Sequence, residues 1–400
     1  MRILVQSGPG SEPDRQEPSL GPTVRRFGWI SFANDAASEM VTPLIPLLLV
    51  GPMGASAALV GLVEGLAEAA CQGLKWLSGR WADRYGRHLR LMVGGYTLSN
   101  LSRPLLGLAL GPLSVLAIRT LDRVGKGIRT APRDALLAHA AIPRHRARAF
   151  GFQRSMDHLG AALGPLIAYA MLQSGASIAT TMLWSFAPAL LTLALFRDFA
   201  PAAPPCETNA STTTWSELDA QGRGLVLAAT MLALSNLPEA LLVVWLHDAG
   251  YGAGQIVLVW AAAHVVKTLI ALPAGALADR VGKRPVIGVG WLARALLLGL
   301  GALFPPSAGV APFAFLAYAA ALACSEGAER ALIAEAAPAA KRGAAFGAYA
   351  ALPGLAALPG GVLFGVIWSR AGAEAAFALG ATTAVLASAL LLRPAPRPGA

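Results

Sequence analysis

The chain has 400 residues, of which 55% are hydrophobic and 14% are charged, and this balance excludes a set of soluble domains. The formal net charge of +10 could indicate a nucleic-acid partner, but the basic residues gather in tails and short loops between apolar segments. We therefore predict an integral membrane protein whose partners are the lipid bilayer and a small solute, with no nucleic acid.

Apolar segments of about 20 residues, long enough to cross a bilayer as helices, recur along the chain. They predict an all-α polytopic membrane protein with twelve transmembrane helices, at 27–50, 56–78, 90–110, 112–134, 148–171, 177–197, 223–246, 254–274, 286–304, 309–334, 344–367 and 374–392. The domains that follow are a disordered tail (1–24), two six-helix bundles (25–198 and 223–393), a Pro-rich linker between them (199–222) and a C-terminal tail (394–400).

Charged residues inside the first three predicted helices are candidates for a polar cavity. Asp35 and Glu39 lie in the first helix, Glu68 and Lys75 in the second, and Arg103 in the third. Charged groups are costly inside a bilayer unless they face water or a partner of opposite charge. We assign Asp35 and Glu39 to the lining of the cavity.

The stretch after the second helix occurs twice, at an offset of 196 residues from Gly79 to Gly275. Each copy contains two glycines, an aspartate and two basic residues: Gly79, Asp83, Arg84, Gly86 and Arg87, then Gly275, Asp279, Arg280, Gly282 and Lys283. The same offset carries Phe150 and Gly151 onto Phe346 and Gly347. A register held over this distance indicates two duplicated units in tandem.

Basic residues are distributed unequally between the two sides of the predicted membrane. Both motif copies, both tails and the loop with Arg144 and Arg146 lie on one side, and the opposite loops contain Arg370. Lys and Arg are enriched in cytoplasmic loops. We therefore predict a multi-pass protein of the inner (plasma) membrane with both termini in the cytoplasm.

The fourth predicted helix carries an unusual density of charge. Arg119, Asp122, Arg123 and Lys126 are spaced by three and four residues and form one stripe, and Arg129 follows one turn later. The stripe can line a polar cavity and act in transport, or it can pair structurally with carboxylates of neighbouring helices. Our working hypothesis is the functional one.

The fifth predicted helix combines charge with a small-residue motif. Arg154 and Asp157 share one face, and Gly160, Gly164 and Pro165 follow. Two glycines four residues apart let helix backbones approach closely, and a proline can bend the helix.

Acidic and basic residues also occur in the seventh and tenth predicted helices. Glu239 lies in the seventh, and Glu326, Glu329 and Arg330 share one face of the tenth. The repeat offset pairs Asp134 with Arg330, so the charge persists at this position but changes sign. We include these four residues among the candidates for the cavity and for coupling.

Together these motifs resemble the major facilitator superfamily of secondary transporters. Gly79–Arg87 resembles its GxxxDRxGRR loop between helices two and three, here present in both halves, and Gly160–Pro165 resembles the GxxxGP motif of its antiporters. The segment DRxGKGxRxxPRDAL at 122–136, with NDxxSEM at 34–40, resembles a bacterial subgroup of permeases.

The resemblance implies two six-helix bundles around a central cavity that opens alternately to each side, lined by helices one, four, seven and ten. It also implies that the two motif loops form a cytoplasmic gate. Asp83 and Asp279 could then accept hydrogen bonds from a helix N-terminus, where the helix dipole is positive.

We therefore expect a proton-coupled secondary transporter that exports a small solute, acts as a monomer, and needs no cofactor or bound metal. One alternative is an importer or exchanger of an organic anion, with Arg119, Arg123 and Lys126 as ligands. Another is a membrane receptor or scaffold that transports nothing. An enzyme is not expected, because the sequence shows no nucleophile–base pair and no metal-ligand spacing.

Overall fold

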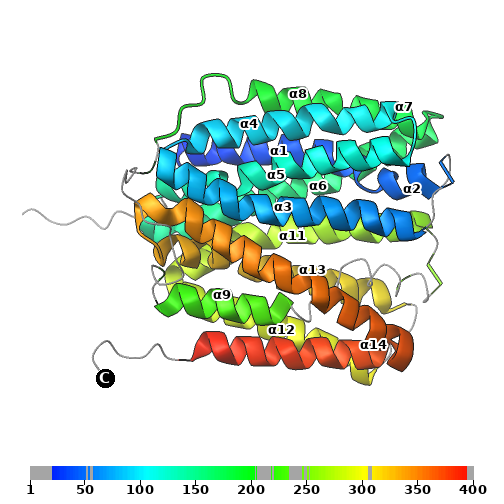
Figure 1. Ribbon diagram of the computed structural model, residues 1–400. Helices are drawn as coiled ribbons and strands as arrows, with labels where there is room; N and C mark the ends of the chain where they lie inside the picture. Colours follow the sequence, from blue (N-terminus) through cyan, green and yellow to red (C-terminus); the bar gives the residue numbers. More distant parts are fainter. Residues whose placement is uncertain are drawn as a thin grey trace, which may run out of the picture.

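The computed structural model describes residues 20–50, 53–54, 57–202, 204, 218, 220–233, 246, 250–251, 253–304 and 309–393. All regular structure in these ranges is helical, and the long helices run side by side between two ends of the molecule (Figure 1). Glu239, most of the predicted N-terminal tail and most of the predicted linker lie outside the described residues.

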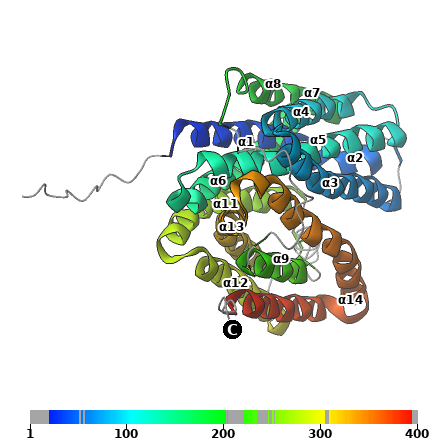
Figure 2. The same ribbon diagram turned by 60° about the vertical axis from the view of Figure 1, so that its left-hand side comes forward.

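The first half of the chain forms the helices drawn in blue to green in Figures 1 and 2. They are α1 (Pro22–Val41), α2 (Leu44–Val50), α3 (Ala57–Tyr85), α4 (His88–Ser102) with the 3-10 helix Arg103–Leu108, α5 (Pro112–Ala140), α6 (Arg146–Gln173), α7 (Ile178–Trp184) and α8 (Phe186–Ala194). The first predicted span is divided into α1 and α2 at Pro43, which has no backbone N–H to continue the helix.

The second half of the chain forms fewer, longer elements. They are α9 (Ala220–Ala233), α11 (Ala253–Val281), α12 (Lys283–Leu303), α13 (Ala311–Glu335) and α14 (Arg342–Leu392). The element α14 covers the last two predicted spans, because only Gly372, with a φ of 87°, interrupts its helical dihedrals. A positive φ suits glycine, and here it allows the chain to turn back on itself (Figure 1).

Within the described residues, four helices are long and apolar enough to cross a membrane by themselves, and all belong to the second half. They are Leu258–Val281, Lys283–Leu303, Ala311–Glu335 and Arg370–Leu392. The long helices of the first half carry more charge, above all α5, whose ionic side chains are partly buried inside the bundle.

The repeat found in the sequence is also a repeat of structure. The offset that relates Gly79 to Gly275 maps α3 onto α11, end to end. The two halves pack through equivalent helix pairs, α6 against α11 and α14 against α3. At their junction Phe150 and Phe346, which are equivalent by the same offset, lie with ring centroids 5.7 Å apart. Both motif loops lie at one end of the molecule, on the left in Figure 1, which we name the motif end.

Candidate functional site

The first motif copy joins the two halves through a helix cap. The Asp83 carboxylate accepts hydrogen bonds from the backbone N–H groups of Gly343, at 3.1 Å, and Ala344, at 2.7 Å. These residues begin α14, and the first N–H groups of a helix have no partner inside the helix. A buried aspartate of the first half therefore caps a helix of the second half at its positive end.

The second motif copy makes the reciprocal contact. Asp279 accepts hydrogen bonds from the N–H groups of Ala147, at 3.1 Å, and Arg148, at 2.8 Å, at the start of α6. Lys283 lies 3.6 Å from Asp279 and 2.9 Å from Glu335. Each aspartate thus accepts from a helix N-terminus, as the sequence predicted, and in each case that helix belongs to the opposite half.

The motif glycines are explained by this packing. A Cβ atom added at Gly79 would overlap the carbonyl group of Gly343, and one added at Gly275 would overlap that of Ala147. Gly86 and Gly282 have φ values of 61° and 101°, in the left-handed region that favours glycine. The first glycine of each copy therefore permits the close approach of the halves, and the second permits the turn.

A histidine that the sequence did not single out completes the first copy. His88 is fully buried, and its Nε2 atom lies 2.7 Å from Asp83 Oδ1. Burial raises the pKa of the Asp83 carboxyl group, and the hydrogen bonds from His88, Ala344 and Gly343 oppose that rise. The basic residues Arg84, Arg87 and Arg280 are exposed.

An ion pair between α5 and α13 links the halves beside these caps. Arg330 Nη1 donates to Asp134 Oδ2, and Arg133 Nε donates to Asp134 Oδ1 at 2.9 Å. Asp134 and Arg330 are equivalent positions of the repeat, 196 residues apart. Equivalent positions meet where the two halves join, so a shared charge would repel there, and the change of sign makes the contact attractive.

The stripe of the fourth predicted helix is divided between two environments. Asp122 accepts hydrogen bonds from Arg103 Nε at 2.9 Å, Ser99 Oγ at 2.5 Å and Arg119 Nη1 at 3.2 Å. The side chains of Arg103, Arg119 and Asp122 are at most 2% exposed. Arg103 also donates to the backbone carbonyl of Asn34, so this network joins α1, α4 and α5 within the first bundle.

The remaining basic residues of α5 face other partners. Arg123 lies 4.0 Å from Glu68 of α3 and Arg129 lies over the Tyr96 ring at 4.1 Å, while Lys126 is half-buried. The donors to Asp122 in the buried network are Ser99, Arg103 and Arg119, so Arg123 and Lys126 lie outside that network. The spacing of three and four residues thus predicted the stripe but not its division.

The charged residues of α1 lie within the first bundle, whereas those of α6 include one that reaches the second half. Asp35 and Glu39 are half-buried, and Asn34 donates to Asp35 at 2.7 Å. On α6, Arg154 Nη1 donates to Asp157 at 2.7 Å, and its Nε atom lies 3.8 Å from Glu326 of α13.

A second contact between α6 and α13 involves a histidine. His158 Nε2 lies 3.2 Å from the same Glu326 oxygen, and the His158 ring lies 5.5 Å from that of His264 on α11. Glu326 therefore connects the second bundle to two side chains of the first.

The helix-five motif is a packing surface. Added Cβ atoms at Gly160 and Gly164 would overlap the carbonyl groups of Phe32 and Ala36 on α1. Pro165 lies buried inside α6. The glycines therefore allow the close packing of α6 on α1.

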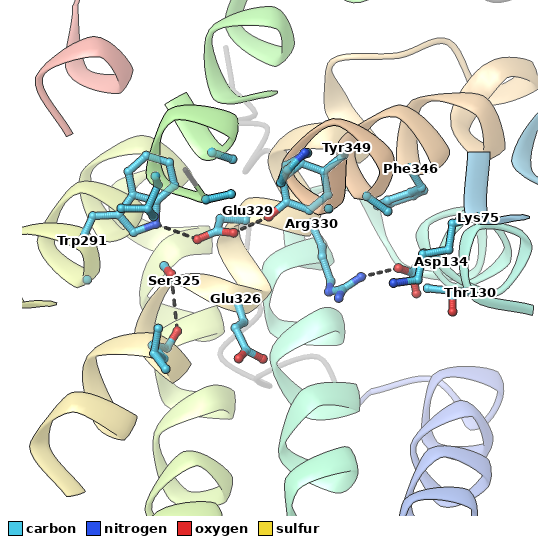
Figure 3. Close-up of a pocket in the computed structure, with 18 of the residues that line it drawn as sticks. Lys75, Thr130, Asp134, Trp291, Ser325, Glu326, Glu329, Arg330, Phe346 and Tyr349 are labelled. Atoms are coloured by element: carbon cyan, nitrogen blue, oxygen red, sulfur yellow. Dashed lines mark hydrogen bonds and ion pairs between the residues drawn. The ribbon is translucent and has the colours of Figure 1, made fainter. Parts of the chain in front are cut away.

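A cavity of about 370 Å³ lies beside the Asp134–Arg330 ion pair (Figure 3). It is lined by α9, α12, α13 and α14 of the second half and by α3 and α5 of the first. Of the predicted cavity residues, Glu326, Glu329 and Arg330 line it. The others that the structure describes do not: Asp35, Glu39, Arg119, Asp122, Arg123, Lys126, Arg129, Arg154 and Asp157.

The model of the Major Facilitator Superfamily matches residues 27–266 and 223–400 of this chain. The chain is 28% identical over 394 residues to an MFS-type transporter of Methanocaldococcus jannaschii, covering 96% of each protein. It is also 32% identical over 128 residues, 32% of each chain, to a multidrug resistance protein of Aeromonas hydrophila.

Solved structures show the same fold. The crystal structure of the human organic anion transporter aligns with a TM-score of 0.79 at 19% identity, covering 94% of this chain and 100% of that one. The family-model match, together with the all-helical structure, confirms the predicted fold of twelve helices in two bundles and a multi-pass membrane transporter that is not an enzyme. The chain belongs to the major facilitator superfamily.

Proposed function

We propose that this protein is a proton-coupled secondary transporter that exports a small solute by alternating access, as a monomer with its motif end in the cytoplasm. The observation that carries the proposal is the pair of reciprocal caps: Asp83 caps the N-terminus of α14, and Asp279 caps the N-terminus of α6. Together with the Asp134–Arg330 ion pair, they tie the halves to each other at the motif end (Figure 1). A transporter needs contacts of this kind, which can break and form again as the cavity changes sides.

The strength of these contacts sets what a switch requires. A hydrogen bond to a charged acceptor contributes about 1.5–3 kcal/mol, so the two caps, with two such bonds each, contribute roughly 6–12 kcal/mol to closure of the motif end. Two conformations that a ligand can exchange must differ by a few kcal/mol, because a ligand shifts the equilibrium only by its differential affinity. Contacts that form when the motif end opens must therefore offset most of the contribution of the caps, and solute and protons supply the remainder.

Coupling to protons is best supported by Glu326. Its carboxylate lies 3.2 Å from His158 and 3.8 Å from Arg154, both on the other half, so a movement of the halves changes its partners. A carboxylate that loses its cationic partners gains a tendency to bind a proton. Proton binding and the opening of the protein are then linked through one side chain.

Export is supported by the helix-five motif and by the multidrug resistance protein among the relatives. The organic-anion alternative would use Arg119, Arg123 and Lys126 as ligands, and of these Arg119 is buried against Asp122. We therefore favour export as the direction of transport.

Glu326→Gln tests the coupling. In proteoliposomes we expect this variant to fold, to exchange solute across the membrane, and to lose about tenfold or more of the transport that a proton gradient drives, because the coupling free energy is removed. Solute uptake with and without the gradient measures this. Glu374→Gln, which changes an exposed carboxylate of the same half, is the control. Gradient-driven transport equal to that of the unchanged protein in Glu326→Gln would contradict this role.

Single cysteines test the orientation of the membrane protein. In a variant without native cysteines, thiols introduced at the exposed positions Arg87 and Arg280 are expected to react only with reagents that enter the cell, and one at the exposed Ala371 with an impermeant maleimide. Labelling of positions 87 and 280 from opposite sides would refute the placement of both motif copies on one side of the membrane.

A further inference from the structure

The cavity beside the Asp134–Arg330 pair has the size of a site for a small solute. Its volume of about 370 Å³ lies near the lower end of the range for ligand pockets and corresponds to roughly twelve water molecules. It lies between the two halves, where a bound molecule can contact both of them (Figure 3).

Several of the charges that line this cavity are already engaged. Arg330 pairs with Asp134, Glu326 pairs with His158 and Arg154, and the Arg294 guanidinium lies 5.4 Å from the centre of the Tyr318 ring. Two other ionisable side chains of the cavity wall, of opposite sign and one on each half of the protein, form hydrogen bonds to neutral partners.

The first is Glu329 on α13. One carboxylate oxygen accepts a hydrogen bond from Trp291 Nε1 at 2.8 Å, and the other accepts one from the Tyr349 hydroxyl. Both donors are neutral, and in the described part of the chain Glu329 forms no ion pair. The rings of Trp291, Phe346 and Tyr349 line the same cavity (Figure 3). Aromatic faces and a carboxylate together attract an organic cation.

The second is Lys75 on α3. Its ammonium group donates to Gln72 Oε1 at 3.1 Å, and among the residues placed by the structure no carboxylate pairs with it directly. Glu68, which accepts from Gln72 at 2.6 Å, lies near Lys126, Lys75 and Arg123, so this one carboxylate is shared among three cations. Ionisable groups inside a membrane protein are costly and need a counter-charge, and here a ligand can supply it.

We propose that this cavity is the solute site and that its solute is a small zwitterion, with the cationic group at Glu329 and the anionic group at Lys75. Glu329 and Lys75 lie on opposite halves, so a molecule that pairs with both charges also bridges the halves. A molecule with one charge satisfies only one wall. The inference rests on the proposed function, because it names the solute class of the same transporter.

Binding to the purified full-length protein tests the solute class without any transport step. The probes are two zwitterions with short and long charge separation, L-phenylalanine and ε-aminocaproate, each compared with its amide, which is a cation, and its N-acetyl form, which is an anion. Calorimetry is expected to show that at least one zwitterion binds about 10- to 100-fold tighter than both of its single-charge derivatives, since each charged hydrogen bond contributes this factor. No binding by either zwitterion, or equal binding of the amide or the N-acetyl form, would overturn the proposal.

Two charge-neutralising variants make the test specific to the two walls. Glu329→Gln, which keeps an acceptor for Trp291, is expected to lose the zwitterion preference and to bind the N-acetyl form best. Lys75→Gln is expected to bind the amide best. Glu374→Gln, at an exposed site, is expected to keep the preference of the unchanged protein. If both cavity variants weaken the binding of all probes equally, the cavity does not recognise the two charges of the ligand and the assignment fails.

Failure of this inference and failure of the proposed function give different results. If no zwitterion binds but another solute is transported in a way that depends on the proton gradient and on Glu326, only the solute class is wrong. If a zwitterion binds with the expected preference but no gradient drives its movement, the site stands and proton-coupled transport is wrong.

Discussion

Replacement of Asp122 by alanine is expected to lower the free energy of unfolding of the first bundle by roughly 3–5 kcal/mol, which would prevent accumulation of folded protein. The reason is that Arg103 and Arg119, both buried, would lose the carboxylate that compensates their charges. A guanidinium cannot lose its proton to escape this cost. The yield of monodisperse protein and its apparent melting temperature in detergent measure the effect.

Two further variants separate structure from transport at this network. Arg123→Gln is the matched control, because it removes a partly exposed charge of the same helix that lies 4.0 Å from Glu68 of α3. The double change Asp122→Asn with Arg103→Gln removes one charge of each sign and is expected to recover much of the lost stability. Normal folding of Asp122→Ala would contradict the structural role. We propose this role for Arg119 and Asp122, and a role nearer to the solute path for Arg123 and Lys126.

Loss of one helix cap is expected to reduce transport strongly while the protein still folds. Asp83→Asn keeps the shape of the side chain but removes the negative charge that faces the N–H groups of Gly343 and Ala344. Each charged hydrogen bond exceeds a neutral one by about 1 kcal/mol, so closure at the motif end should weaken by about tenfold or more. The initial rate of solute transport in proteoliposomes, at equal protein content, is the measurement.

The second motif copy and the exposed Asp198 provide comparisons for this variant. Asp279→Asn should have a similar effect, because Asp279 caps α6 in the same way. Asp198→Asn should have none, since this side chain is exposed and asparagine tolerates the positive φ of 57° at that position. Asp83→Asn and Asp279→Asn variants that both transport at the normal rate would show that the caps do not control closure.

The amino-acid sequence by itself determined the membrane class, the order of the helices and the duplication. These features depend on local quantities: the length of an apolar run and the fixed offset between Gly79 and Gly275. The resemblance of the two motif copies to the family's loop also implied that Asp83 and Asp279 accept hydrogen bonds at a helix N-terminus. Which helix each one caps was decided by the packing of the two halves.

The tertiary structure alone decided which charges meet. Helical spacing placed Asp122 and Lys126 in one stripe, but the rotation of α5 against α4 directs Asp122 to Arg103, and no local pattern encodes that rotation. Likewise, Asp134 meets Arg330, and Lys75 shares a cavity with Glu329, because the two halves are packed against each other through equivalent surfaces. Periodicity gives the face of a helix on which a side chain lies, whereas only the packing of the helices gives its partner across the interface.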